Sequence, residues 1–186
     1  VLNDNTTVSG ITLNGSGTAD SVGITVNGDA TINEVTVGTS GGSKSFTTGV
    51  ELTDGATAAI SDSIISAYSN TFNDTSGDGR SNANAIGVKE DGNNALTIVD
   101  STINSTTGSL GGSSRAVQVG SGSAATISDS TLNASGDSGL AVMGLFASSA
   151  GAIDVSGSTI TSSSSGGAAY GAYLRATSGD VNIDDS

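Results

Sequence analysis

The stretch that decides the fold of this chain is Ile127-Ser-Asp-Ser-Thr-Leu132, because close variants of it recur along the whole sequence. Earlier forms begin at Val8 (VSGITL), Ile32 (INEVTV), Ile60 (ISDSII) and Ile98 (IVDSTI), and later forms at Val155 (VSGSTI) and Ile183 (IDDS). From Val8 onward, the leading aliphatic residues are successively 24, 28, 38, 29, 28 and 28 residues apart. A period near 28 residues is typical of a solenoid, in which each repeat is one coil that cannot bury its own apolar face.

The composition agrees with an ordered stack of coils. The 186 residues include 28 glycines and only 3% aromatics, yet the 34% hydrophobic residues fall in short alternating runs rather than being scattered. There is no proline, which suits backbone ladders in which every strand pairs with two neighbours. There is no cysteine either, so disulfides and thiolate metal sites are excluded.

The charge limits the possible partners. Five basic and 18 acidic residues give a net charge of −13, which repels phosphate backbones and anionic lipid heads. We therefore expect no nucleic-acid partner and no direct membrane contact, and no apolar run is long enough for a transmembrane helix. Because the last repeat is cut off after Ser186, we expect residues 1–186 to be a single segment of a longer protein.

One coil can be traced from Val117 to Asp137. Val117 and Val119 alternate with Gln118 in a first short strand, and a Gly/Ser turn leads to a second strand around Ile127. A bend then leads to a third strand that begins at Thr131. Three short strands and three turns predict a triangular coil, so we expect an all-β, right-handed parallel β-helix of about seven coils.

Stacking the repeats brings equivalent residues into interior columns. One column is expected to contain Val8, Ile32, Ile60, Ile98, Ile127, Val155 and Ile183. A second is expected to contain Leu13, Val37, Ile65, Ile103, Leu132 and Ile160. Each fully buried aliphatic side chain contributes roughly 1.5–3 kcal/mol, against an ordering cost of roughly 1–2 kcal/mol per residue, so only a stack of coils is stable.

Two polar columns lie between these aliphatic columns. One is an acidic column of Glu34, Asp62, Asp100, Asp129 and Asp185, in which Gly10 and Gly157 take the place of the acid in two coils. Such carboxylates could bind a divalent cation or form a glycosidase pair. The exchange of Asp with Gly instead favours a tight bend, and the adjacent serine column from Ser63 to Ser158 fits a small residue at the same corner.

A threonine column, which includes Thr12, Thr36 and Thr102, could form part of an ice-binding lattice. Such a surface needs a second matched column beside it. The expected neighbours are Ser9, Asn33, Ser61, Val99, Ser128 and Ser156, which are too mixed to repeat a lattice. The sequence therefore does not favour ice binding.

The strongest local anomaly is the interval of 38 residues between Ile60 and Ile98, which predicts an inserted loop over residues 68–85. Loops that project from a regular scaffold are frequent sites of recognition. The candidate ligand-binding residues in this segment are Tyr68, Phe72, Asp74, Asp78 and Arg80. The aromatic and arginine side chains are typical anchors of binding interfaces, whereas a tolerated insertion without a role remains the alternative.

No catalytic or metal motif is convincing. The string Gly136-Asp-Ser-Gly139 matches a serine-protease segment, but the mechanism requires a general base and the chain has no histidine. The stretch from Asp74 to Gly79 lacks the alternating ligands and final glutamate of an EF-hand loop. We expect no enzymatic activity, no cofactor and no metal.

The chain as a whole resembles the passenger domains of bacterial autotransporters, and most closely AIDA-type and self-associating adhesins. The resemblance rests on Ser/Gly/Thr/Asn-rich coils such as ATISDSTLNASG and VSGSTITSSSSG, on the missing cysteine and on the acidity. It implies a right-handed β-helix at the cell surface or secreted, anchored through a C-terminal outer-membrane barrel that is not in this chain. It also implies attachment to a fibronectin-like host extracellular matrix protein, self-association in biofilms, or binding of a glycan.

Two other functions remain open. The rod could be a structural stalk that displays another domain, or a polysaccharide-acting enzyme or tailspike that shares the fold. Because the chain is so acidic, sulfated glycans should be repelled unless Lys44, Arg80, Lys89, Arg115 and Arg175 gather locally.

Overall fold

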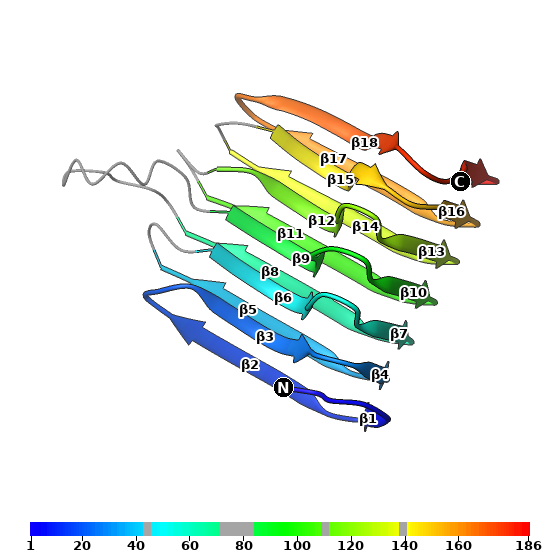
Figure 1. Ribbon diagram of the computed structural model, residues 1–186. Helices are drawn as coiled ribbons and strands as arrows, with labels where there is room; N and C mark the ends of the chain where they lie inside the picture. Colours follow the sequence, from blue (N-terminus) through cyan, green and yellow to red (C-terminus); the bar gives the residue numbers. More distant parts are fainter. Residues whose placement is uncertain (43–45, 71–83, 109–111, 138–140) are drawn as a thin grey trace.

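The chain forms a single β-solenoid, described here from a computed structural model that covers residues 1–42, 46–70, 84–108, 112–137 and 141–186. The described residues contain nineteen strands and no helix, and the strands form three parallel sheets. Six complete coils of three strands each are followed by one strand of a seventh coil. The prediction of an all-β parallel solenoid with a period near 28 residues is confirmed (Figure 1).

Each coil contributes one strand to each sheet, so the sheets are named in the order in which a coil reaches them. The first sheet contains β1 (Thr6–Ser9), β4 (Asp29–Asn33), β7 (Thr57–Ser61), β10 (Ala95–Val99), β13 (Ala124–Ser128), β16 (Ile153–Ser156) and β19 (Val181–Asp184). The second contains β2 (Thr12–Gly17), β5 (Thr36–Gly41), β8 (Ile64–Ser69), β11 (Thr102–Thr107), β14 (Thr131–Gly136) and β17 (Thr159–Ser164). The third contains β3 (Ser21–Val26), β6 (Phe46–Leu52), β9 (Asn84–Glu90), β12 (Ser114–Val119), β15 (Ala141–Ala150) and β18 (Ala168–Ala176).

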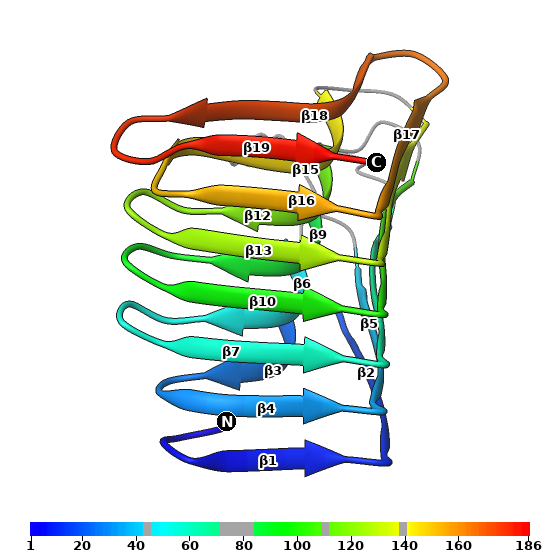
Figure 2. The same cartoon turned by 90° about the vertical axis from the view of Figure 1, so that its right-hand side faces the viewer.

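The coil is right-handed, as predicted. In Figure 2 the chain rises from β1 at the bottom and runs to the right along the first sheet, then away from the viewer along the second. It returns to the left along the third sheet and enters the next coil one level higher. Nearly all parallel crossovers have this hand, because right-twisted strands pack back onto a sheet only in that sense.

The register of the strands confirms the alignment of both predicted columns, but Ile183 in the last strand is 50% exposed and is not an interior residue. Ile98 pairs with Ile60 and Ile127 in the first sheet, and Ile103 pairs with Ile65 and Leu132 in the second. All six side chains are at most 1% exposed. The core is therefore a stack of aliphatic residues, and each one contacts equivalents about 4.8 Å away along the rod.

The corner between the first and second sheets is a tight bend in the left-handed backbone region. Asp62, Asp100 and Asp129 have φ of 49°, 48° and 49°, and Gly10 and Gly157 occupy the same position with φ of 66° and 55°. Only glycine, asparagine and aspartate enter this region at low cost. Backbone geometry therefore accounts for the aspartates and glycines of this column, in agreement with their exchange in the sequence, whereas Glu34 holds the same position with φ of 53° and is not a residue that this region favours.

The serine that follows this bend is buried and hydrogen-bonded along the rod. The amide of Ser101 donates to Ser130 Oγ at 3.1 Å, while Ser101 Oγ donates to the carbonyl of Val99 at 2.7 Å. The same two contacts recur at Ser63, Ser130 and Ser158. Each hydroxyl thus satisfies two backbone groups that a buried corner would otherwise leave unpaired.

The second and third sheets approach so closely that one column of the third sheet requires residues without large side chains. A Cβ placed on Gly87 would lie 2.5 Å from Ile103 Cγ2, and one on Gly49 would lie 2.4 Å from Ile65 Cγ2. Gly23 and Gly144 meet the same limit. In β12 the equivalent position is occupied by Ala116. The residue that faces Ala116 is Leu132, which, unlike isoleucine, carries no methyl group on its Cβ.

The strands extend into both ends of the expected insertion. Tyr68 belongs to β8, where it pairs with Ser40 and Thr106, and Asn84 and Ala85 belong to β9. The boundaries of 68–85 were therefore too wide, because Tyr68 continues the inward–outward alternation of β8 with Ala67 and Ser69 buried. Residues 71–83 lie outside the described part of the chain.

Candidate functional site

Of the five residues predicted to bind a ligand, the described structure contains one. Tyr68 lies on the outer face of the second sheet, and 42% of its surface is exposed. Phe72, Asp74, Asp78 and Arg80 lie outside the described residues. The site is therefore built here from Tyr68 and from the sheet that carries it.

The strands of the second sheet contain no charged residue. Its six strands of six residues each contain no Asp, Glu, Lys or Arg, although the whole chain has a net charge of −13. Three outward columns cover this face: Thr12, Thr36, Ile64, Thr102, Thr131 and Thr159; Asn14, Gly38, Ser66, Asn104, Asn133 and Thr161; Ser16, Ser40, Tyr68, Thr106, Ser135 and Ser163. The face is a regular array of hydroxyl and amide groups.

This arrangement corrects one prediction. The residues expected beside the threonine column, from Ser9 to Ser156, lie at the ends of first-sheet strands and thus on another face. The true neighbouring column contains asparagine, glycine, serine and threonine. The described face therefore has no matched lattice for ice, because the column beside the threonines is itself mixed.

In the later coils, these polar side chains bond to one another. Asn133 Nδ2 donates to Asn104 Oδ1 at 3.0 Å, and Asn104 Nδ2 donates to Ser66 Oγ at 3.3 Å. The hydroxyls of Thr106 and Ser135 lie 2.9 Å apart. Such ladders fix the rotamers of the side chains and make the face rigid.

Two shallow hollows flank Tyr68 on this face. One has a volume of about 390 Å³ and is lined by Asn14, Gly15, Ser16, Gly38, Thr39, Ser40, Ser66 and Tyr68. The other, of about 410 Å³, is lined by Tyr68, Thr106, Thr107, Gly108, Ser135, Gly136, Asp137 and Ser163–Ser165. Tyr68 is the one aromatic side chain of the second sheet and separates the two hollows.

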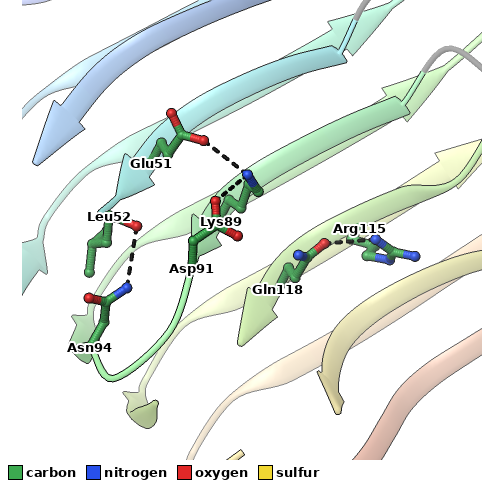
Figure 3. A network of polar contacts seen from close by, with 7 residues as sticks. All are labelled: Glu51, Leu52, Lys89, Asp91, Asn94, Arg115 and Gln118. Carbon is green, nitrogen blue, oxygen red and sulfur yellow. Dashed lines mark hydrogen bonds and ion pairs between the residues drawn. The ribbon is translucent and has the colours of Figure 1, made fainter. Parts of the chain in front are cut away.

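The described basic residues lie elsewhere, on the third sheet. Lys89 Nζ lies 3.0 Å from Glu51 Oε1 and also contacts Asp91, as Figure 3 shows. Burial lowers the pKa of Lys89, but the hydrogen bonds and charges of Asp91 and Glu51 outweigh it, and the pKa is raised. Lys89 therefore keeps its positive charge, which the carboxylates of Glu51 and Asp91 balance. Lys44 and Arg80 lie outside the described residues.

Arg115 is held by a different set of contacts. Its Nη1 donates to Gln118 Oε1 at 2.7 Å (Figure 3), and its guanidinium lies 4.4 Å from the centroid of the Phe146 ring. Phe146 in turn stacks on Tyr173, with centroids 5.5 Å apart and an interplanar angle of 17°. Burial lowers the pKa of Arg115. The Phe146 ring thus contacts both Arg115 and Tyr173, which stabilises this row of the third sheet, whereas Tyr173 itself remains 45% exposed.

Glu90 is a buried acid that the sequence analysis missed. It is 0% exposed and occupies the interior position that Leu52 holds in the preceding coil. Among the described residues, neither carboxyl oxygen has a hydrogen-bond partner with good geometry. Burial raises the pKa of Glu90 to about 8, and the nearby Ser123 hydroxyl lowers this pKa only in part. The same hydroxyl accepts a hydrogen bond from the backbone N–H of Asn94 at 3.1 Å.

The acid at position 90 could have been found in the sequence. Aligning VEL at 50–52 with VKE at 88–90 puts Glu90 level with a core leucine. The neighbouring Lys89 and Asp91 instead suggest an ordinary solvated turn.

A metal site finds no support in the described residues. No group of three or more His, Cys, Asp or Glu side chains comes together there. The bend carboxylates belong to successive coils and lie in one line along the corner, where backbone geometry accounts for them. The described part of the chain likewise contains no helix that is long and apolar enough to cross a membrane.

Three comparisons with known proteins complete the description of the site. No protein-family model matches the chain, and no significant match is found among curated proteins or solved structures. Its function therefore has to be argued from the geometry above.

Proposed function

We propose that this chain is an adhesive rod of a bacterial surface protein, which associates with like copies through the outer face of its second sheet. The observation that carries the proposal is the absence of any charged residue in the six strands of that sheet, on a chain with net charge −13. The resemblance to autotransporter adhesins motivates a location at the cell surface, with an outer-membrane barrel elsewhere in the protein as anchor.

The distribution of charge favours this face for contact between two copies. The other two sheets present carboxylates such as Asp29, Asp154 and Glu51, so contact through them brings like charges together at a cost. Within their strands, second sheets that face each other meet hydroxyls, amides, Gly38, Tyr68 and Ile64, and Asp137 lies just beyond the end of β14. Both partners also repeat with the same spacing along the rod, so many equivalent contacts can form at once.

Each such contact is weak, because exposed serine, threonine and asparagine side chains are already hydrated. The strength of attachment then depends on the number of contacts. Many rods on two facing cells bind at once, and each bound pair raises the effective concentration of the next. A host matrix protein of the fibronectin class could use the same face, and the experiment below distinguishes that partner from self-association.

The test places equal charge on two different faces of the same coils. Thr36→Glu with Thr102→Glu adds two carboxylates to the second sheet, and Thr31→Glu with Thr97→Glu adds them to the first sheet. Both double variants have the same net charge. We expect self-association in sedimentation velocity to weaken by roughly tenfold or more in the first variant and to change little in the second.

An equal effect of the two double variants would exclude the second sheet as the contact face. If the parent rod does not self-associate but binds immobilised fibronectin in a manner sensitive to the second-sheet variant only, the partner is a matrix protein. If neither association is detected, the rod is a stalk that displays another domain.

A further inference from the structure

The hollow on the N-terminal side of Tyr68 exists because one outward column lacks a side chain. Gly38 lies between Asn14 and Ser66 in that column and has no side chain, and Asn14 Oδ1 lies 2.8 Å from the position that a Cβ on Gly38 would take. Tyr68, which is 42% exposed, forms a wall beside its register partner Ser40. The volume of about 390 Å³ is within the range of about 300–1,000 Å³ for small-molecule sites.

The polar groups around this hollow differ from those of the second hollow. Within the described residues, the Asn14 amide and the hydroxyls of Ser16 and Ser40 have no hydrogen-bond partner. Across Tyr68, the hydroxyls of Thr106 and Ser135 bond to each other. The first hollow therefore retains donors and acceptors that are free to bind a ligand, next to an aromatic ring.

The charge around the hollow selects the class of ligand. No acidic or basic side chain lines it, whereas Asp137 lines the second hollow. The described basic residues Lys89, Arg115 and Arg175 belong to third-sheet strands, so an acidic sugar would find no counter-ion here. Hydroxyls and an amide can both donate and accept hydrogen bonds, as the hydroxyls of a neutral sugar require.

From these features we propose that the Tyr68 hollow binds one ring of a neutral hexose polymer. The ring packs its apolar C–H face on Tyr68, above the backbone at Gly38, and its hydroxyls bond to Asn14, Ser16 and Ser40. The site rests on the proposed function in that it lies on the same adhesive face, but its partner is a glycan rather than a second copy of the chain.

The experiment uses the whole chain and three neutral probes, cellohexaose, maltohexaose and mannohexaose, in calorimetric titration with hexagalacturonate as the acidic comparison. At least one neutral oligomer is expected to bind in the millimolar range or tighter, and more strongly than the uronate. Tyr68→Ala should weaken that binding by roughly tenfold, whereas Tyr68→Phe keeps the ring and most of the affinity. Gly38→Asn, which adds the side chain that the same column carries at positions 14, 104 and 133, should weaken binding similarly.

The matched control is Tyr170→Ala, which removes an exposed tyrosine from the third sheet and should leave binding unchanged. Absence of binding by all three neutral oligomers would overturn the proposal, as would equal binding of the uronate or an equal loss in Tyr170→Ala. Self-association of the parent chain is measured separately by sedimentation in the absence of any oligomer, so either the glycan binding or the self-association can fail while the other is observed. Failure of the glycan site and failure of the adhesive face are therefore distinguishable.

Discussion

At the residue scale, Glu90 has the clearest energetic consequence, because its carboxyl is buried without a good partner in an aliphatic column. Its folded pKa of about 8 exceeds the unfolded value near 4.5. Between these values the folded protein holds a proton that the unfolded chain has released. The free energy of unfolding therefore falls as pH rises from about 5 to about 8, at roughly 1.4 kcal/mol per pH unit from this group.

We predict that Glu90→Gln removes this part of the pH dependence, because an amide has the same shape and does not titrate. Chemical unfolding followed from pH 5 to pH 8 should give a flatter profile for the variant than for the parent, with similar stabilities near pH 5. The charged residues nearest in the chain, Lys89 and Asp91, bond to each other on the outer surface and are common to both proteins. Parallel profiles would show that Glu90 is already ionised at neutral pH.

The bend residue Asp129 permits a second prediction at this scale. Its φ of 49° disfavours a β-branched side chain, so Asp129→Val should lower the free energy of unfolding by about 1–2 kcal/mol. Asp129→Gly should cost little, because Gly10 and Gly157 hold the same place in other coils. Urea unfolding measures both, with Thr126→Val on the exposed face of β13 as control. A harmful glycine and a tolerated valine would contradict the argument.

At the element scale, the close approach of the second and third sheets couples a glycine to the residue that it faces. A Cβ at position 87 would lie 2.5 Å from Ile103 Cγ2 and 2.6 Å from the carbonyl oxygen of Ala116. We predict that Gly87→Ala lowers the free energy of unfolding by about 1–3 kcal/mol through overpacking. Adding Ile103→Leu should recover part of this loss, because the equivalent pair Ala116 and Leu132 already exists in the next coil.

This coupling is measured by a double-mutant cycle in urea, with Ile103→Leu as the second single variant. Gly15→Ala is the matched control, since a Cβ at Gly15 meets nothing within 4 Å. Strictly additive costs for Gly87→Ala and Ile103→Leu would show that the facing side chain does not limit the glycine position.

At the scale of the whole molecule, the net charge opposes association of two copies, whereas the uncharged contact face favours it. Two copies with −13 each repel one another over a distance of about 30 Å at 0.01 M salt, but only about 8 Å at 0.15 M. The contact proposed here contains no ion pair that salt could weaken. We therefore predict that self-association strengthens between 0.01 and 0.15 M salt, as measured by sedimentation velocity. Weakening over the same range would indicate a contact made by ion pairs on another face.

The sequence by itself determined the coil, its period and its first-to-second corner. The alternation around Ile98 and Ile127 is a property of a few consecutive residues, and the exchange of Asp129 with Gly157 reports a backbone angle at a single residue. Each of these signals is local and is repeated in nearly every coil. Because the same signals recur, the register of the interior columns follows from the spacing of the aliphatic residues alone.

Only the tertiary structure decided which residues of different sheets contact one another inside the rod. The requirement for glycine at position 87 depends on a second-sheet side chain 16 residues away. The spacing of the repeats puts Tyr68 in a loop, and only pairing with Ser40 and Thr106 places it on the uncharged sheet. These features depend on the cross-section of the rod, because distances between different sheets are set by how closely the sheets pack and not by the local pattern of the chain.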